Sequence, residues 1–130
     1  LKSNWVLVDF KSSACEIPDI FGITCEKTTL IEVKVSRSDF MADLKKPYRA
    51  KGEGIGKYRY YLCPENLIKE NELLEGWGLL FCDSGGRITL KKDSEAFNER
   101  DIQHELSIHQ SVIRRLAGSH KVLDFRVQTK

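Results

Sequence analysis

The fold is decided by two short apolar runs, Pro18-Asp19-Ile20-Phe21-Gly22-Ile23 and Leu30-Ile31-Glu32-Val33-Lys34-Val35. The second run is typical of a strand that is covered on both faces, apart from Glu32 and Lys34. Side chains two residues apart on a strand point to the same face, so these two opposite charges share one side. Burying such groups without partners costs several kcal/mol. The arrangement therefore marks a candidate functional site.

The composition predicts one soluble globular domain that spans residues 1–130. Hydrophobic residues make up 41% of the chain and charged residues 31%, which argues against disorder. No apolar run approaches the roughly 20 residues of a membrane-spanning helix, and the start lacks a signal-peptide pattern. The sequence begins at Leu1 without an initiator methionine, so we expect upstream sequence to be missing and residues 1–4 to be the tail of a helix.

The cysteines and histidines do not predict a metal site. No two cysteines form a C-x-x-C pair, and each lies in or beside an apolar stretch, which is typical of buried free thiols in a reducing cytoplasm. His104 and His109 are five residues apart, a poor spacing for one helical face. We therefore expect a cytoplasmic protein. The cysteines are Cys15, Cys25, Cys63 and Cys82.

Apolar and alternating runs predict a series of strands. They are expected at residues 5–10, 16–23, 28–35, 57–63 and 77–82, and residues 87–90 are expected to pair with the last of these as a hairpin. A final strand or extended tail is expected at residues 122–127. Of the aromatic residues near the site, Tyr61 alone is expected outside the core.

Helices are expected between these strands. Ser36 and Asp39 form a capping box for a helix from Arg37 to about Lys46, which Pro47 ends. A short helix is expected at residues 65–69, and the longest helix at residues 99–117 with Gly118 as its cap. The buried positions of that longest helix are predicted to be Ile102, Leu106, Ile108, Val112, Ile113 and Leu116.

Asp19, Glu32 and Lys34 together indicate metal-dependent phosphodiester hydrolysis. Asp19 and Glu32, on adjacent strands, can supply two carboxylate oxygens to Mg²⁺ or Mn²⁺, and the backbone carbonyl of Val33 can supply a third ligand. Lys34 would then lie beside the metal-bound water, where an ammonium favours deprotonation and stabilises charge that develops on a phosphate.

The spacing of these residues is similar to a known nuclease motif. Pro18-Asp19, a gap of 12 residues and Glu32-Val33-Lys34 resemble the PD-(D/E)XK motif of restriction-endonuclease-like nucleases. Within that superfamily, residues 30–44 resemble the "EIK-S-R-x-DF" core of the MmcB-like predicted DNA-repair endonucleases. Residues 57–64 and 76–80 resemble the next two strands of that family.

The resemblance implies an α/β fold, with a mixed sheet flanked by helices, and metal-dependent cleavage of DNA. It makes Asp19 and Glu32 metal ligands and Lys34 the catalytic lysine. Repair and the processing of mobile-element or phage DNA are the settings it suggests. Many relatives carry a further acid on a helix before the first strand. Glu16 is near Asp19, but on a regular strand it would point to the opposite face, so it is a weak substitute.

A basic stretch follows the candidate site and predicts contacts to DNA phosphates. Without the resemblance, an ordinary solvated surface explains this stretch, and a salt bridge on a solvated sheet face explains Glu32 and Lys34. A homodimer is a further expectation, because a dimer could cut both strands of a duplex. The predicted phosphate contacts are Arg37, Lys45, Lys46, Arg49, Lys51, Lys57 and Arg59.

A second class of function stays open beside the nuclease. A nucleic-acid-binding or assembly module could keep the same fold and not cleave. A phosphoryl-transfer enzyme that acts on small nucleotides is disfavoured, because the glycine-rich residues 52–57 lack the phosphate-loop pattern.

Overall fold

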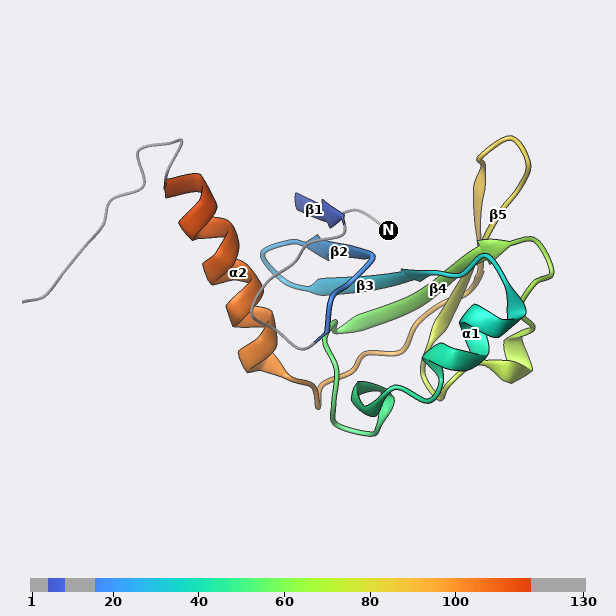
Figure 1. Ribbon diagram of the computed structural model, residues 1–130, viewed down its shortest axis with the longest axis horizontal. Helices are drawn as coiled ribbons and strands as arrows, with labels where there is room; N and C mark the ends of the chain where they lie inside the picture. Colours follow the sequence, from blue (N-terminus) through green and yellow to red (C-terminus); the bar gives the residue numbers. More distant parts are fainter. Residues whose placement is uncertain (1–4, 9–15, 118–130) are drawn as a thin grey trace, which may run out of the picture.

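The computed structural model describes residues 5–8 and 16–117, which form a six-stranded mixed sheet and two α-helices (Figure 1). The strand order is β1-β2-β3-β4-β5-β6. β3, β4 and β5 run parallel, and the other neighbours pair antiparallel. The predicted α/β class with a mixed sheet is confirmed. The strands are β1 (Trp5–Val8), β2 (Ile20–Ile23), β3 (Thr28–Val33), β4 (Tyr58–Pro64), β5 (Gly78–Cys82) and β6 (Ile88–Lys92).

The predicted capping box begins α1 (Arg37–Asp43) where expected. The Ser36 hydroxyl accepts a 3.2 Å hydrogen bond from the Asp39 amide. The helix ends earlier than Lys46, because the residue before Pro47 is held in an extended conformation with ψ of 139°. A 3-10 helix, η1 (Pro47–Arg49), follows and brings the chain back beside the end of α1.

The predicted helix at residues 65–69 is wrong. Asn66 has a φ of +64°, in the left-handed region, which ends any right-handed helix at that point. β4 runs on to Pro64, and a 3-10 helix, η2 (Glu70–Glu72), forms further along. The predicted second strand also begins late, at Ile20, so Glu16 and Asp19 lie on the irregular segment that enters β2.

The long helix α2 (Ile102–Ala117) forms, but most of its predicted buried positions are wrong. Ile108 is buried and Val112 packs against the core, together with the buried Glu105. These positions are three and four residues apart and share one helical face. The second apolar stripe faces away from the core: Ile102, Leu106, Ile113 and Leu116 are 43–61% exposed. Gly118 and residues 122–127 lie outside the described residues.

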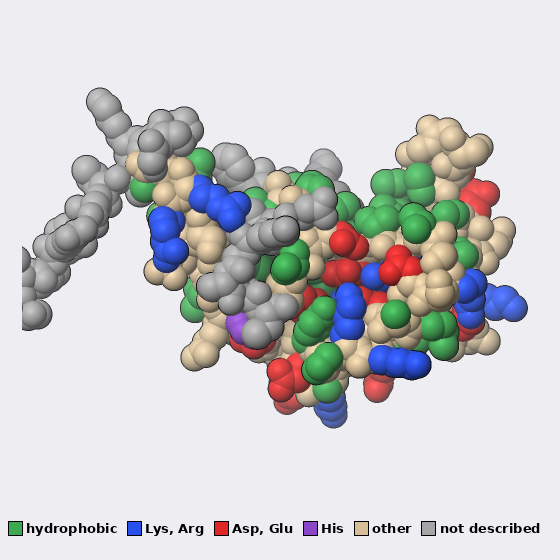
Figure 2. Space-filling view, in the orientation of Figure 1, with side chains coloured by type: hydrophobic (Ala, Val, Ile, Leu, Met, Phe, Trp, Pro, Cys, Tyr) green, Lys and Arg blue, Asp and Glu red, His purple; other side chains and the backbone are tan. Residues whose placement is uncertain are grey.

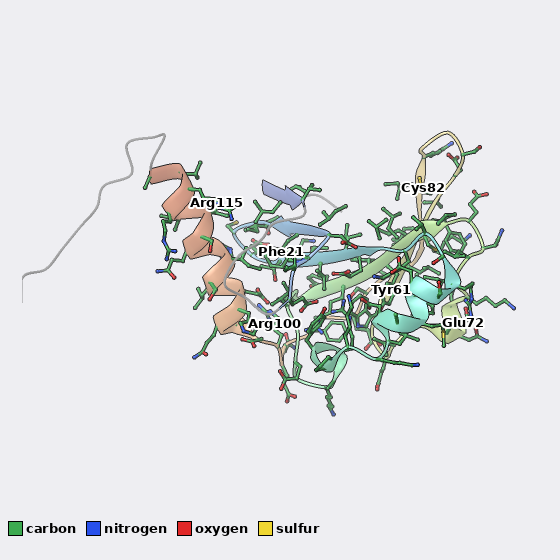
Figure 3. The ribbon with its side chains drawn as sticks, viewed as in Figure 1. Phe21, Tyr61, Glu72, Cys82, Arg100 and Arg115 are labelled. Carbon is green, nitrogen blue, oxygen red and sulfur yellow. The ribbon has the colours of Figure 1, made fainter. Side chains whose placement is uncertain are left out.

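Both helices pack on one face of the sheet, because Phe40 of α1 and Ile108 of α2 belong to the same buried cluster. Tyr61 is fully buried in that cluster, so its expected place outside the core is wrong. Figure 3 shows Tyr61 between β4 and α1. Of the cysteines, Cys63 is buried as expected, whereas Cys25 in the β2–β3 turn is exposed. No helix in the described part of the chain is long and apolar enough to cross a membrane.

Candidate functional site

Glu32 and Lys34 point from the end of β3 toward α1, and their side chains are 4% and 5% exposed. Lys34 Nζ lies 3.6 Å from Glu32 Oε2 and 3.3 Å from Asp43 Oδ1. Glu32 and Lys34 therefore share one face of the strand, as the sequence predicts. The alternative, a salt bridge on a solvated sheet face, is wrong because both side chains are buried. Figure 2 shows acidic and basic side chains meeting in the middle of this view, over β3 and beside α1.

Asp43, the last residue of α1, is the centre of this charge network. Its carboxylate accepts hydrogen bonds from the Tyr61 hydroxyl at 2.6 Å and from Arg49 Nε at 2.9 Å. The same carboxylate lies 2.9 Å from Lys46 Nζ and 3.3 Å from Lys34 Nζ. A side chain with no exposed surface is thus surrounded by three cations and a hydroxyl.

The surroundings of Asp43 favour its ionised form. Burial alone would raise the pKa of this carboxyl, but hydrogen bonds from Arg49 and Tyr61 outweigh burial and hold the pKa well below its usual range. The pKa of the Tyr61 hydroxyl is strongly raised, first by burial and then by its bond to Asp43. The Asp43 carboxylate is therefore fully satisfied within the protein.

Arg49 joins this centre to two further acids. Its Nη1 lies 2.5 Å from Glu16 Oε1, and its Nη2 lies 3.6 Å from Glu32 Oε1. The guanidinium stacks 4.8 Å from the ring centre of Trp77. Burial lowers the pKa of Arg49, but its bonds to Asp43 and Glu16 outweigh that effect and raise it. Arg49 is an interior ion-pair partner.

Glu16 lies inside this network and not on the opposite face of a strand. Its carboxylate accepts hydrogen bonds from Arg49 and, at 3.1 Å, from the amide of Ile55. The expected opposite direction is wrong because residues 16–19 are not part of β2. Burial raises the pKa of Glu16, opposed by Arg49. Glu16 thus connects the entry to β2 with η1 and the loop before β4.

Glu32 differs from Asp43 and Glu16 because it has cations nearby but no hydrogen bond from them. Its Oε2 lies 3.6 Å from Lys34 Nζ, and its Oε1 lies 3.6 Å from Arg49 Nη2. Both distances are longer than a hydrogen bond. Burial raises its pKa to about 7. Arg49 and Lys34 lower the pKa, while the negative charges of Asp19 and Asp43 raise it. Glu32 is therefore a buried carboxylate that lacks sufficient positive partners.

Asp19 lies beside the same end of β3. Its Oδ2 accepts a 2.8 Å hydrogen bond from the Val33 amide. The N–H and C=O of one strand residue point to the same neighbour, and the Lys34 amide bonds instead to Leu62 of β4. The Val33 carbonyl is therefore directed toward the Asp19 side. The structure thus places Asp19 beside Val33, the residue that follows Glu32 in the chain.

These oxygen donors suit a small divalent cation that keeps several waters. A cation would supply the positive charge that Glu32 lacks, and the second oxygen of Asp19 is not used by the Val33 amide. Within the described residues there is no group of three or more His, Cys, Asp or Glu side chains arranged to hold a metal. The fit therefore depends on two carboxylates, one carbonyl and water.

The predicted phosphate contacts divide into three groups. Arg49 and Arg59 are buried and bonded internally, so the prediction that they form part of a surface track is wrong. Arg37 pairs with Glu72 at 2.6 Å, and Lys46 pairs with Asp43. Figure 3 shows Glu72 on the far side of α1 from the sheet's β1 edge. The remaining lysines are Lys45, Lys51 and Lys57, which have no ion pair among the described residues.

Sequence reasoning missed Asp43 and Arg49 as parts of the site. Asp43 looked like one acid in a basic stretch, and Arg49 looked like a surface cation. A signal existed in the apolar position of Asp43, which lies three residues after the buried Phe40 on the same helical face. Its partner could not be found that way, because η1 decides where Arg49 points.

No family model and no curated protein matches the chain. A solved structure is similar to it: a protein of unknown function from Silicibacter pomeroyi, SPO1766. The two have 17% sequence identity and a TM-score of 0.61, over 92% of this chain and 84% of that chain. At this identity the likeness concerns the fold alone.

Proposed function

We propose that the protein is a metal-dependent deoxyribonuclease that hydrolyses phosphodiester bonds through Asp19, Glu32 and Lys34. The observation that carries the proposal is the geometry of Glu32, a buried carboxylate that lies 3.6 Å from both Lys34 and Arg49 without a hydrogen bond to either, and whose pKa burial raises to about 7. Perturbed groups of this kind gather at functional sites. DNA repair, or the processing of mobile-element or phage DNA, is the setting that the motif suggests.

Asp19, Glu32 and the Val33 carbonyl would hold Mg²⁺ or Mn²⁺. The bound ion supplies a polarised water and neutralises charge on a phosphate oxygen. Asp19 is fixed by the Val33 amide, so its free oxygen keeps one direction. The Lys34 ammonium lies 3.6 Å from Glu32, where it can orient the attacking water and stabilise the negative charge of the transition state.

The DNA backbone would be held by the exposed lysines rather than by the whole basic stretch. Lys45 and Lys51 are exposed and Lys57 is half-buried, and none has an acidic partner among the described residues. Replacement of these three lysines should make DNA binding less sensitive to salt, because each phosphate contact releases about one counterion. The expected phosphate track is thus shorter than the sequence indicates.

The direct test is incubation with single-stranded, duplex, flapped and branched DNAs in Mg²⁺, Mn²⁺ or chelator. We expect cleavage that chelator abolishes and that Lys34→Ala abolishes without loss of the folded state, measured by circular dichroism. Lys69→Ala, an exposed lysine away from the network, is the matched control and should retain activity. Unchanged cleavage by Lys34→Ala would remove Lys34 from the mechanism.

The second candidate is a nucleic-acid-binding module that does not cleave. The exposed Lys45 and Lys51, which have no acidic ion-pair partner among the described residues, would serve such a module without any catalysis. Salt-sensitive DNA binding with no cleavage in either metal would select this function over the nuclease.

A further inference from the structure

A cavity of about 440 Å³ lies next to the charge network, and the proposed catalytic residues Asp19, Glu32 and Lys34 do not line it. Arg49 and Arg59 line it, together with residues 50–52, 74–77 and 95–99. Its size is in the range of pockets that hold small molecules. Arg49 is already occupied by Glu16 and Asp43, so Arg59 is the cation of interest in this cavity.

Arg59 is buried but incompletely partnered. It is 2% exposed, its Nε donates to the Gly56 carbonyl at 3.0 Å, and its guanidinium lies 4.2 Å from the ring centre of Phe97. Its Nη2 is the one buried side-chain nitrogen or oxygen without a hydrogen-bond partner in the described part of the chain. Burial lowers the pKa of Arg59 to about 10, partly offset by Glu16. A carboxylate in the cavity would neutralise the charge of this guanidinium, which has no acidic ion-pair partner among the described residues.

The rest of the lining has the opposite charge. Glu75, Glu95 and Glu99 line the same cavity and are exposed, with Lys51 as the other exposed charge. Glu95 Oε2 lies 3.5 Å from the position that a Cβ would take on Gly76, so this carboxylate lies beside a wall that has no side chain. Three carboxylates repel a polyanion such as DNA, and they attract an ammonium group.

The cavity also has an apolar part, formed by Leu74, Trp77 and Phe97. Trp77 and Phe97 are held in place by Tyr61 and Arg59, which stack on them at 4.4 Å and 4.2 Å. We propose that this cavity binds a small zwitterion: its carboxylate against Arg59, its ammonium toward the glutamates, and an apolar group against these three side chains. A free amino acid with an apolar side chain has this chemistry.

The first test measures binding of L-leucine by the shift of the Arg59 Nε–H signal in ¹⁵N NMR. The matched probes are 4-methylpentanoate, which lacks the ammonium, isopentylamine, which lacks the carboxylate, and inorganic phosphate. We expect a saturable shift with leucine at millimolar concentration, a weaker one with the acid, and none with the amine. No shift with leucine, or tighter binding of phosphate than of leucine, would overturn the proposal.

The second test uses variants. Arg59→Lys keeps the charge but loses the planar fork, and we expect about tenfold weaker leucine binding. If that variant does not fold, the exposed pair Glu75→Gln and Glu95→Gln carries the test: leucine binding should fall to the level of the acid probe. Glu26→Gln, exposed in the β2–β3 turn, is the control. Unchanged leucine affinity in the glutamine pair contradicts the proposal, whatever the outcome of the nuclease assays.

Discussion

Two buried carboxylates, Asp43 and Glu32, lie in one charge network yet have opposite surroundings. Asp43 accepts two short hydrogen bonds and lies between three cations, and its pKa is lowered. Glu32 lies 3.6 Å from its cations, and its pKa is raised to about 7. Ionised Asp43 therefore stabilises the fold, whereas ionised Glu32 destabilises it. Carboxylates of this second kind gather at functional sites.

The largest expected effect is the loss of folding stability when Asp43 is replaced. Asp43→Asn leaves Arg49 and Lys34 without their shared anion, and removal of one partner from a buried pair costs about 3–5 kcal/mol. Urea unfolding at pH 7 measures this loss. Glu53→Gln, an exposed acid in the loop before β4, should change stability by less than about 0.5 kcal/mol. A small loss in Asp43→Asn would show that the two carboxylates do not differ as described.

Glu32→Gln is expected to increase folding stability at high pH, whereas Asp43→Asn decreases it. The rise in pKa from 4.5 to about 7 corresponds to roughly 3 kcal/mol, an upper limit for this buried group. The folded state binds the proton of the Glu32 carboxyl more tightly than the unfolded state does. The contribution of protonated Glu32 to the free energy of unfolding is therefore fully present below pH 4.5 and is lost as the pH rises through 7. Glu32→Gln should therefore be more stable than the parent at pH 8 and equal to it at pH 4. Equal urea midpoints at pH 8 would contradict the assignment.

A smaller loss is expected for Tyr61→Phe. The change removes the hydroxyl that donates to Asp43 at 2.6 Å and leaves the ring in the core. A hydrogen bond to a charged group contributes about 1.5–3 kcal/mol. Tyr58→Phe is the matched control, because the Tyr58 hydroxyl has no hydrogen bond among the described residues. Equal effects of the two changes on the urea midpoint would argue against a special role of Asp43.

The positions of the strands along the chain could be predicted from the sequence, because alternating and apolar runs determine β2 to β6 locally. The shared face of Glu32 and Lys34 followed from the two-residue period of β3. Asp43, Arg49 and Glu16 could not be placed. Their meeting depends on where α1 ends, on η1, and on an irregular entry to β2. These features depend on tertiary contacts that no local pattern contains.

The α2 helix shows a second limit of sequence patterns. Its two apolar stripes are both consistent with burial, and the sequence does not say which one faces the sheet. Glu105 belongs to the stripe that packs, because Thr28 and the Gly56 amide satisfy its carboxylate at 2.8 Å and 3.1 Å. The hydrogen bonds of this buried glutamate to β3 and to the loop before β4 determine which face of α2 packs against the sheet, although the other face is more apolar. Arg100, labelled in Figure 3 at the start of α2, adds an ion pair to the same carboxylate.

The smallest expected effect is the pH dependence of metal affinity. A metal ion must displace the proton of Glu32, whose pKa is about 7. Affinity for Mg²⁺ should therefore be about tenfold weaker at pH 6 than at pH 8, since roughly a tenth of Glu32 is ionised at pH 6. Titration at the two pH values, with proton uptake by the buffer recorded, checks this. Equal affinities would indicate that Glu32 is not a ligand.

The most direct measurement of the central claim is a calorimetric titration of Mn²⁺ at pH 8 into the protein and into Asp19→Asn and Glu32→Gln. The account predicts one ion bound by the parent protein and none by either variant, while both variants remain folded by circular dichroism. Lys34→Ala should still bind the ion, because the lysine is not a ligand. Binding that survives in Glu32→Gln, or no binding by the parent protein, would contradict the assignment of this end of β3 as a metal site.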